Sequence, residues 1–123
     1  MLLHLDFTLE TPIYQQIRNE IVRRIASGEL RTGELLPPIR TLAENLGINM
    51  MTVGKAYGLL KQEDYLQADR RAGTRVCRPH RDVFSPELRQ RLELAAAEAK
   101  ASGASMEDVL EICRAVYEGG ERK

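Results

Sequence analysis

Two short helical segments joined by a tight turn, within residues 38–57, constrain the fold of this chain more than any other feature. In residues 38–47 apolar side chains recur at helical spacing, and the segment ends at Gly47, a residue suited to a left-handed helix C-cap. Asn49 is a good N-cap for a second segment, whose apolar residues again share one face. This layout is typical of a helix-turn-helix, in which the second helix lies in the DNA major groove.

A β-hairpin is predicted directly after the second helix. Two short β-like runs, at residues 65–68 and 74–77, flank a turn that contains Gly73. The formal net charge of the chain is zero, yet residues 65–82 hold five arginines against two aspartates. These arginines are Arg70, Arg71, Arg75, Arg78 and Arg81. The sequence therefore predicts a mainly α fold with a small basic hairpin, or wing, which is a winged helix-turn-helix.

A supporting helix is predicted before this unit. Thr11 can cap it and Pro12 suits its first position, and isoleucines at positions 13, 17, 21 and 25 form one apolar stripe that ends near Gly28. Residues 29–36 are predicted to be a connection rather than a regular element. We expect residues 1–78 to form the DNA-binding domain and residues 79–85 to form a linker.

Residues 86–123 are predicted to form a tail of two helices. Ser85 followed by Pro86 begins the first helix, and Ser105 with Asp108 resembles a capping box for the second. This helical hairpin is too small to fold alone, so it must bury its apolar faces against the first domain or against a second copy. The predicted dimerisation residues are Leu88, Leu92, Ala96, Ala99, Val109, Leu110, Cys113, Val116 and Tyr117.

Several classes of function are disfavoured by the sequence. It contains no paired nucleophile and base, no glycine-rich phosphate loop and no metal-binding cysteine spacing, so we expect neither an enzyme nor a cofactor or metal. Cys77, Cys113, His4 and His80 are each isolated. No apolar run is long enough to span a membrane and no signal peptide is recognisable, so a cytoplasmic protein is expected.

The chain resembles the GntR family of bacterial transcription regulators over roughly residues 7–78. The matching residues are Pro12, Ile13, Tyr14, Gln16, Ile17, Ile25, Gly28, Glu29, Leu30, Gly33, Leu36, Pro37, Arg40, Leu42, Ala43, Leu46, Gly47, Ile48, Asn49, Thr52, Val53, Lys55, Ala56, Tyr57, Leu60, Leu66, Gly73 and Thr74. The two-helix tail is similar to that of the YtrA subfamily. This resemblance implies a homodimeric repressor of transcription that binds a double-stranded DNA operator. Two-fold pairing of the tails would require that operator to be palindromic.

The resemblance also implies which residues contact DNA. Arg40 falls where the family has a DNA-contacting arginine, and Thr52 and Lys55 match positions of the recognition helix that face DNA. Gly73 matches the wing glycine that enters the minor groove. The complete set of predicted DNA-binding residues is Arg40, Asn49, Met50, Met51, Thr52, Lys55, Arg70, Arg71, Gly73 and Arg75.

The recognition helix also departs from the family. Met50 and Met51 stand where the subfamily often has Pro and Asn, and thioethers cannot identify bases by hydrogen bonding, although they can pack against a thymine methyl. Helical geometry places Met51, Gly54 and Gly58 on the outward face. The alternative is therefore a protein-interaction module that uses the Met50, Met51 and Gly54 face. A small-molecule effector of unknown identity remains open, because no polar cluster in the tail indicates a ligand.

Overall fold

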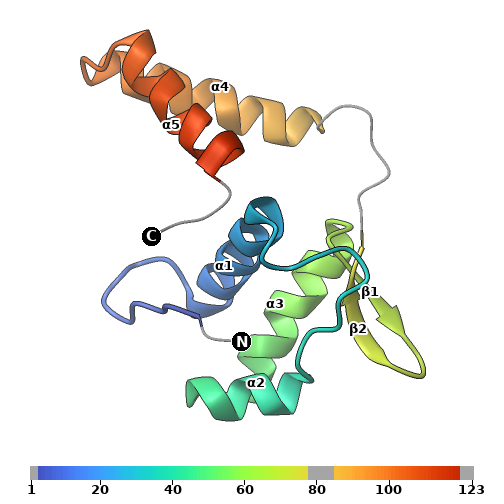
Figure 1. Ribbon diagram of the computed structural model, residues 1–123. Helices are drawn as coiled ribbons and strands as arrows, with labels where there is room; N and C mark the ends of the chain where they lie inside the picture. Colours follow the sequence, from blue (N-terminus) through green and yellow to red (C-terminus); the bar gives the residue numbers. More distant parts are fainter. Residues whose placement is uncertain (1–2, 78–84, 120–123) are drawn as a thin grey trace. The chain divides into compact units, whose positions relative to one another are not determined.

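The computed structural model describes residues 3–77 and 85–119, and the chain divides into two units, Met1–Pro79 and His80–Lys123. The first unit contains three helices and a hairpin, and the second contains two helices (Figure 1). The elements are α1 (Ile13–Ser27), α2 (Ile39–Leu46), α3 (Met50–Gln62), β1 (Leu66–Asp69), β2 (Gly73–Val76), α4 (Pro86–Ala101) and α5 (Met106–Gly119). The predicted fold class, a mainly α winged helix-turn-helix with a helical hairpin, is confirmed. Most of the predicted linker, like Arg78, His80 and Arg81, lies outside the described residues.

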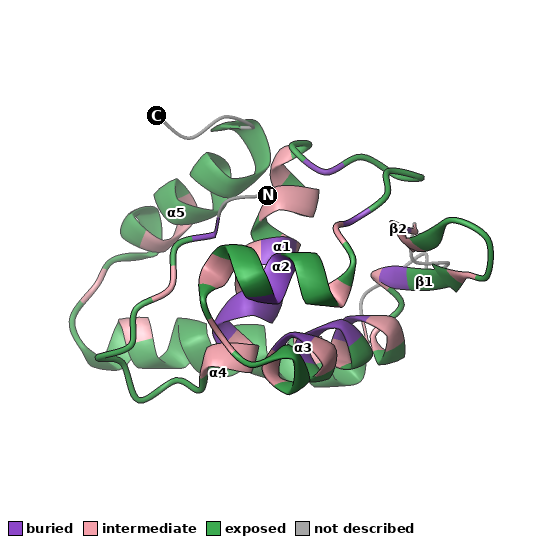
Figure 2. Cartoon of the chain, turned by 90° about the horizontal axis from the view of Figure 1, so that it is seen from below, coloured by how far each residue is buried: buried purple, intermediate pink, exposed green. Residues whose placement is uncertain are grey.

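The core of the first unit lies where α3 packs against α1 and α2. Ile17 and Ile21 of the isoleucine stripe are fully buried, whereas Ile13 and Ile25 at its ends are half-buried. The apolar faces predicted for α2 and α3 supply Leu42, Val53 and Leu60, each with no exposed surface. Figure 2 shows buried residues along α1 and α3 and none along α4 or α5. Helical periodicity therefore identified the core of this unit.

Most of the predicted helix starts are confirmed, but that of α1 is not. The side chains of Asn49 and Ser85 accept hydrogen bonds from backbone N–H groups of their helices, and Ser105 and Asp108 form the reciprocal capping box. At α1, however, the cap position is Pro12, whose ψ of 148° is extended, and no side chain caps the helix. Thr11 instead offers its carbonyl oxygen to the Gln16 amide, which also binds the backbone of Asp6.

The turns that end α2 and α3 both use left-handed backbone conformations. Gly47 has φ 69°, and its N–H bonds back to the carbonyls of α2, as predicted. Asp64, two residues after the end of α3, has φ 68°. Aspartate tolerates this conformation better than most residues do. Both turns therefore place a residue that tolerates positive φ at the position that requires it.

The wing has a third extended segment that the sequence analysis missed. β1 and β2 pair antiparallel, with Leu66 opposite Val76. Residues 33–36, predicted to be a simple connection, run along the other edge of β2, where Leu35 forms a bridge with Arg75. Hydrogen bonds of 2.7–2.9 Å link the backbone of this segment to Thr74 and Val76. The connection thus covers an edge of the hairpin that would otherwise be unpaired.

A partly buried ion pair joins α1 to the end of α3. The Arg18 side chain is 10% exposed; its Nε and Nη2 donate to the two carboxylate oxygens of Glu63 at 2.9 and 3.2 Å, and Nη1 donates to Asn19. The guanidinium carbon also lies 5.7 Å from the centre of the Tyr65 ring, which immediately precedes β1. Arg18 therefore fixes the point at which the recognition helix gives way to the wing.

Tyr57 anchors the start of α2 by a hydrogen bond whose removal has a predictable cost. Its side chain is buried and its hydroxyl donates to the Pro37 carbonyl oxygen at 2.7 Å. Burial raises the pKa of Tyr57, so the hydroxyl remains a donor at any working pH. We expect Tyr57→Phe to lower the free energy of unfolding by about 1 kcal/mol, measured by urea denaturation.

Tyr65→Phe is the matched control for that measurement, since Tyr65 is half-buried in the same unit and its hydroxyl makes no hydrogen bond to another described residue. It should unfold at the wild-type urea concentration. Equal midpoints for Tyr57→Phe and wild type would show that the hydroxyl contributes nothing to the position of α2.

Between residues 85 and 119, the second unit has no buried residue. α4 and α5 are joined by the turn at residues 102–105, and several large apolar side chains on both helices are exposed. Neither helix, nor any other in the described part of the chain, is long and apolar enough to cross a membrane. A helical hairpin with this surface needs another partner for its apolar faces.

Candidate nucleic-acid interface

The first turn of α3 forms the centre of the candidate interface. The Asn49 side chain accepts a hydrogen bond from the Met51 N–H at 2.7 Å, which caps the helix and occupies that oxygen. Met50 and Met51 are both exposed, Met51 to 81% of its surface, and Thr52 is half-buried on the flank. This turn therefore offers thioethers and a hydroxyl, with few groups able to identify a base by hydrogen bonding.

Lys55, one turn further along α3, lies against the aromatic ring of Tyr14. Its ammonium nitrogen lies 4.1 Å from the centre of the Tyr14 ring on α1. Together with Met51 and Thr52, these two residues line an open hollow beside the helix. No sequence spacing connects positions 14 and 55, so only the packing of α1 on α3 reveals the pair.

Arg40 is the exposed cation of α2. Among the described residues, its guanidinium has no hydrogen-bond or ion-pair partner, in contrast to Arg18. A charge that the protein leaves unpaired and exposed can bind a phosphate without first breaking an internal contact. This position agrees with the role that the resemblance gives to Arg40.

The tip of the wing is shaped by Asp69. Its carboxylate accepts hydrogen bonds from the backbone N–H groups of Arg71 and Ala72 at 3.0 and 3.2 Å. The bond from Arg71, followed by that from the Arg75 side chain, lowers the pKa of Asp69. These contacts are complete when the pH is above the ordinary pKa of aspartate. They are lost as the pH falls through the lowered pKa of Asp69. The turn presents Arg70 and Arg71 to solvent, and it ends at Gly73 with φ 109°.

Arg75 differs from the other predicted wing cations. Its Nη2 and Nε donate to Asp69 at 3.0 and 3.3 Å, and its Nη1 donates to the Gly33 carbonyl oxygen at 2.7 Å. The guanidinium thus ties the hairpin to the segment at residues 33–36. A contact between Arg75 and DNA remains a prediction, whereas its hydrogen bonds within the wing are part of the structure.

The outward face of α3 is smaller than predicted. Gly58 is exposed, and no atom lies near the position of an added Cβ, but Gly54 is half-buried. An added Cβ at Gly54 would lie 3.9 Å from the Ile39 side chain of α2. Gly54 therefore lies at the edge of the outward face, where α2 packs beside α3.

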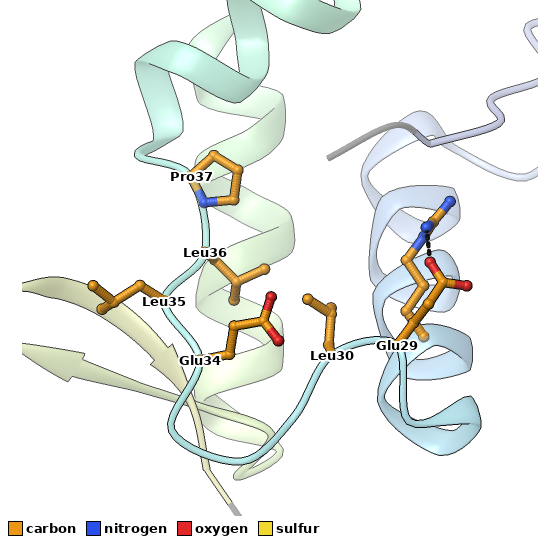
Figure 3. A pocket seen from close by; sticks show the side chains of 7 residues that line it. Glu29, Leu30, Glu34, Leu35, Leu36 and Pro37 are labelled. Carbon is orange, nitrogen blue, oxygen red and sulfur yellow. Dashed lines mark hydrogen bonds and ion pairs between the residues drawn. The ribbon is translucent and has the colours of Figure 1, made fainter. Parts of the chain in front are cut away.

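A second hollow lies beside the C-terminal part of α1 (Figure 3). Glu29 is paired there with Arg24, and Glu34 and Leu30 lie opposite each other, whereas Leu35 points away. The complete lining is Arg24, Glu29, Leu30, Glu34, Leu35, Leu36 and Pro37. Its two carboxylates would repel phosphates, so this hollow does not belong to the nucleic-acid interface. No group of three or more potential metal ligands occurs in the described ranges.

Comparisons with known proteins place this geometry in a family. The chain is 29% identical over 118 residues to the HTH-type regulator YhcF of Bacillus subtilis, covering 94% of this chain and 98% of that protein. It is 35% identical over 75 residues to the probable rhizopine catabolism regulatory protein MocR of Rhizobium meliloti, but spans only 15% of that protein's length.

Two solved structures are also similar. YtrA from Sulfolobus acidocaldarius, a GntR-family transcription factor, is 38% identical with a TM-score of 0.67, and the match covers 79% of this chain and 99% of that one. The DNA-binding domain of AraR, solved with its operator ORE1, is 26% identical with a TM-score of 0.53, and the match covers 63% and 94%. Residues 13–76 match the family described as bacterial regulatory proteins, gntR family. The chain therefore belongs to the GntR family and is a YtrA-like, DNA-binding transcription regulator.

Proposed function

We propose that this regulator is a homodimeric repressor that binds a palindromic operator through two winged helix-turn-helix units. The observation that carries the proposal is the surface around the first turn of α3, where Met51, Lys55 and the unpaired Arg40 are all exposed. In this fold the second helix of the pair enters the major groove. Two units related by a two-fold axis would then read two symmetric half-sites.

The predicted contacts fall into two groups. Arg40, Arg70 and Arg71 bind phosphates and supply affinity that is independent of sequence, and Gly73 brings the wing backbone close to the minor groove. Met51 and Thr52 face base edges beside Met50, with Asn49 as the cap that orders their turn, and Lys55 extends from the next turn toward a phosphate. Since only a few of these groups can hydrogen-bond to bases, phosphate contacts provide most of the affinity.

The tail supplies the dimer in this proposal. Neither α4 nor α5 buries a residue within its own unit, and the YtrA resemblance assigns dimerisation to this part of the chain. The protein has no catalytic role and acts in the cytoplasm, where chromosomal DNA is located. Nothing in the described tail indicates which effector, if any, controls it.

Arg40→Ala tests the DNA interface. We expect this change to weaken binding to the tightest duplex selected from random DNA by about tenfold, in the range of a lost charge-assisted contact. The slope of log affinity against log salt should also decrease by about 0.9, as for one lost phosphate contact. Fluorescence anisotropy over a salt series measures both quantities.

Arg23→Ala provides a control with the same change of charge in the same unit, since Arg23 is exposed and paired with Glu20 on α1. It should leave affinity and slope within about twofold of wild type. Wild-type binding that is indifferent to salt, or equal effects of the two substitutions, would contradict the proposed interface.

The protein-interaction alternative is favoured by one observation, the exposure of Met50 and Met51. Methionine-rich surfaces can adapt to protein partners. If this alternative holds, the selection from random DNA will recover no salt-sensitive, tightly bound duplex, and the methionines will be protected from oxidation in the solution dimer.

A further inference from the structure

The hollow beside α3 combines two helices that are distant in the sequence. It is lined by Tyr14 of α1 and by Met51, Thr52 and Lys55 of α3. Most of this lining is carbon and sulfur: an aromatic ring, a thioether, a threonine methyl and the lysine methylenes. The charged atom, the Lys55 ammonium nitrogen, lies 4.1 Å from the centre of the ring.

An apolar hollow on the first turn of a recognition helix matches one group of the major groove. Base edges there present hydrogen-bond donors and acceptors, and thymine alone presents a methyl group, at C5. A thioether and the face of an aromatic ring contact such a methyl favourably and are poor hydrogen-bonding partners for the donors and acceptors of the other base edges. Phosphates next to that thymine carry the negative charge that complements Lys55.

We propose that this hollow is the specificity-determining site of the recognition helix, in which Met51 and Thr52 receive a thymine C5-methyl while Tyr14 positions Lys55 toward a neighbouring phosphate. The inference rests on the proposed DNA interface. Tyr14 acts here through Lys55: a lysine held over a ring has fewer conformations to lose when it binds. The site explains how a recognition helix that begins with two methionines can still discriminate between sequences.

Deoxyuridine substitution tests the methyl contact directly. Each thymine of the selected duplex is replaced in turn by deoxyuridine, which removes only the C5-methyl. For the wild type we expect one thymine in each half-site at which affinity falls about three- to fivefold, the effect of losing one buried methyl group. For Met51→Ala the same replacement should change affinity by less than about 1.5-fold.

Gln62→Ala is the control, because Gln62 is exposed on the same helix, does not line the hollow and is not among the predicted DNA-binding residues. This variant should keep the wild-type response to deoxyuridine. The inference is overturned, with DNA binding intact, if no thymine is methyl-sensitive in the wild type, or if Met51→Ala and Gln62→Ala respond alike. Failure of the wild type to bind any selected duplex would overturn the proposed DNA interface itself.

Two substitutions at Tyr14 test its positioning role. Tyr14→Phe keeps the ring and should bind within about twofold of wild type, whereas Tyr14→Leu should bind about two- to fivefold more weakly. The salt slope of Tyr14→Leu should approach that of Lys55→Ala, and Tyr14→Leu should have no further effect in the Lys55→Ala background. Additive effects of the two changes would show that Tyr14 acts independently of Lys55 and would overturn its role.

Discussion

Arg18→Ala is expected to lower the free energy of unfolding of the DNA-binding unit by about 2–4 kcal/mol. The substitution removes both hydrogen bonds to Glu63 and the contact with Tyr65, and it leaves a carboxylate that is only 30% exposed without its partner. Desolvating an unpaired carboxylate accounts for most of the cost, since the intact pair itself is worth less than its disruption. Urea unfolding of the full-length chain, followed by circular dichroism, measures the change.

Arg89→Ala supplies the comparison for this prediction. Arg89 and Glu93 form an ion pair on α4 at 3.7 Å, and both side chains are more than 60% exposed. Breaking a pair of this kind should change stability by less than about 0.5 kcal/mol. If Arg18→Ala were equally mild, the pair between α1 and α3 would have to be treated as a surface interaction.

A double substitution separates charge from packing at the same place. Arg18→Met with Glu63→Leu removes both ions and retains apolar volume, so it should recover much of the stability lost in Arg18→Ala. DNA binding by this double variant then reports whether the ion pair also orients the wing. We expect weaker DNA binding with near-normal stability, because Arg18 no longer joins Glu63 at the end of α3 to Tyr65 before β1.

The scaffold could be predicted from the sequence because its determinants are local. A stripe of isoleucines at helical spacing has few ways to be buried, and Gly47 and Asn49 mark the end of one helix and the start of the next. Thr11 shows the limit of such rules. Proline is compatible with either the cap or the first helical position, and the extended ψ of Pro12 makes Pro12 itself the cap.

The parts of the site that the sequence did not reveal depend on long-range packing. The bridge between Leu35 and Arg75 exists only once the hairpin has folded against residues 33–36. The position of Lys55 over Tyr14 likewise requires α1 to pack along α3. Helical geometry alone predicts that Lys55 faces outward, but it does not predict that the Tyr14 ring lies against its ammonium group.

The wing arginines differ in whether their guanidinium groups are free to contact DNA, and local structure explains only part of this difference. Arg70 and Arg71 occupy the tip of a turn that Asp69 orders, so their exposure follows from local structure. The guanidinium of Arg75, by contrast, donates hydrogen bonds to the Asp69 carboxylate and to the Gly33 carbonyl oxygen, which is distant in the sequence. Counting arginines by sequence therefore overstates the charge that the wing has free for DNA.

Leu92→Glu is expected to convert the proposed dimer to a monomer and to weaken binding to a two-half-site operator by at least about 100-fold. Leu92 is 52% exposed on α4, within the predicted dimerisation stripe. In a two-fold dimer each copy would bury one added carboxylate without a partner, which is strongly unfavourable. Linked half-sites also lose the high effective concentration that the dimer provides.

Leu94→Glu is the matched control, since it adds the same charge to the same helix. Leu94 is 61% exposed and lies about 200° around α4 from Leu92, outside the predicted stripe. It should remain a dimer by sedimentation velocity and bind the operator as the wild type does. Both variants should bind a single half-site equally well, because neither changes the winged unit.

The outcome also defines the extent of the dimer interface on α5. Val116 is in the predicted stripe, and Ile112, one turn before it and also exposed, was not predicted but lies on the same face. Ile112→Glu should therefore resemble Leu92→Glu if that face is buried between copies. Dimers that persist in Leu92→Glu but dissociate in Leu94→Glu would place the interface on the opposite side of α4 and assign dimerisation to side chains that sequence periodicity did not select.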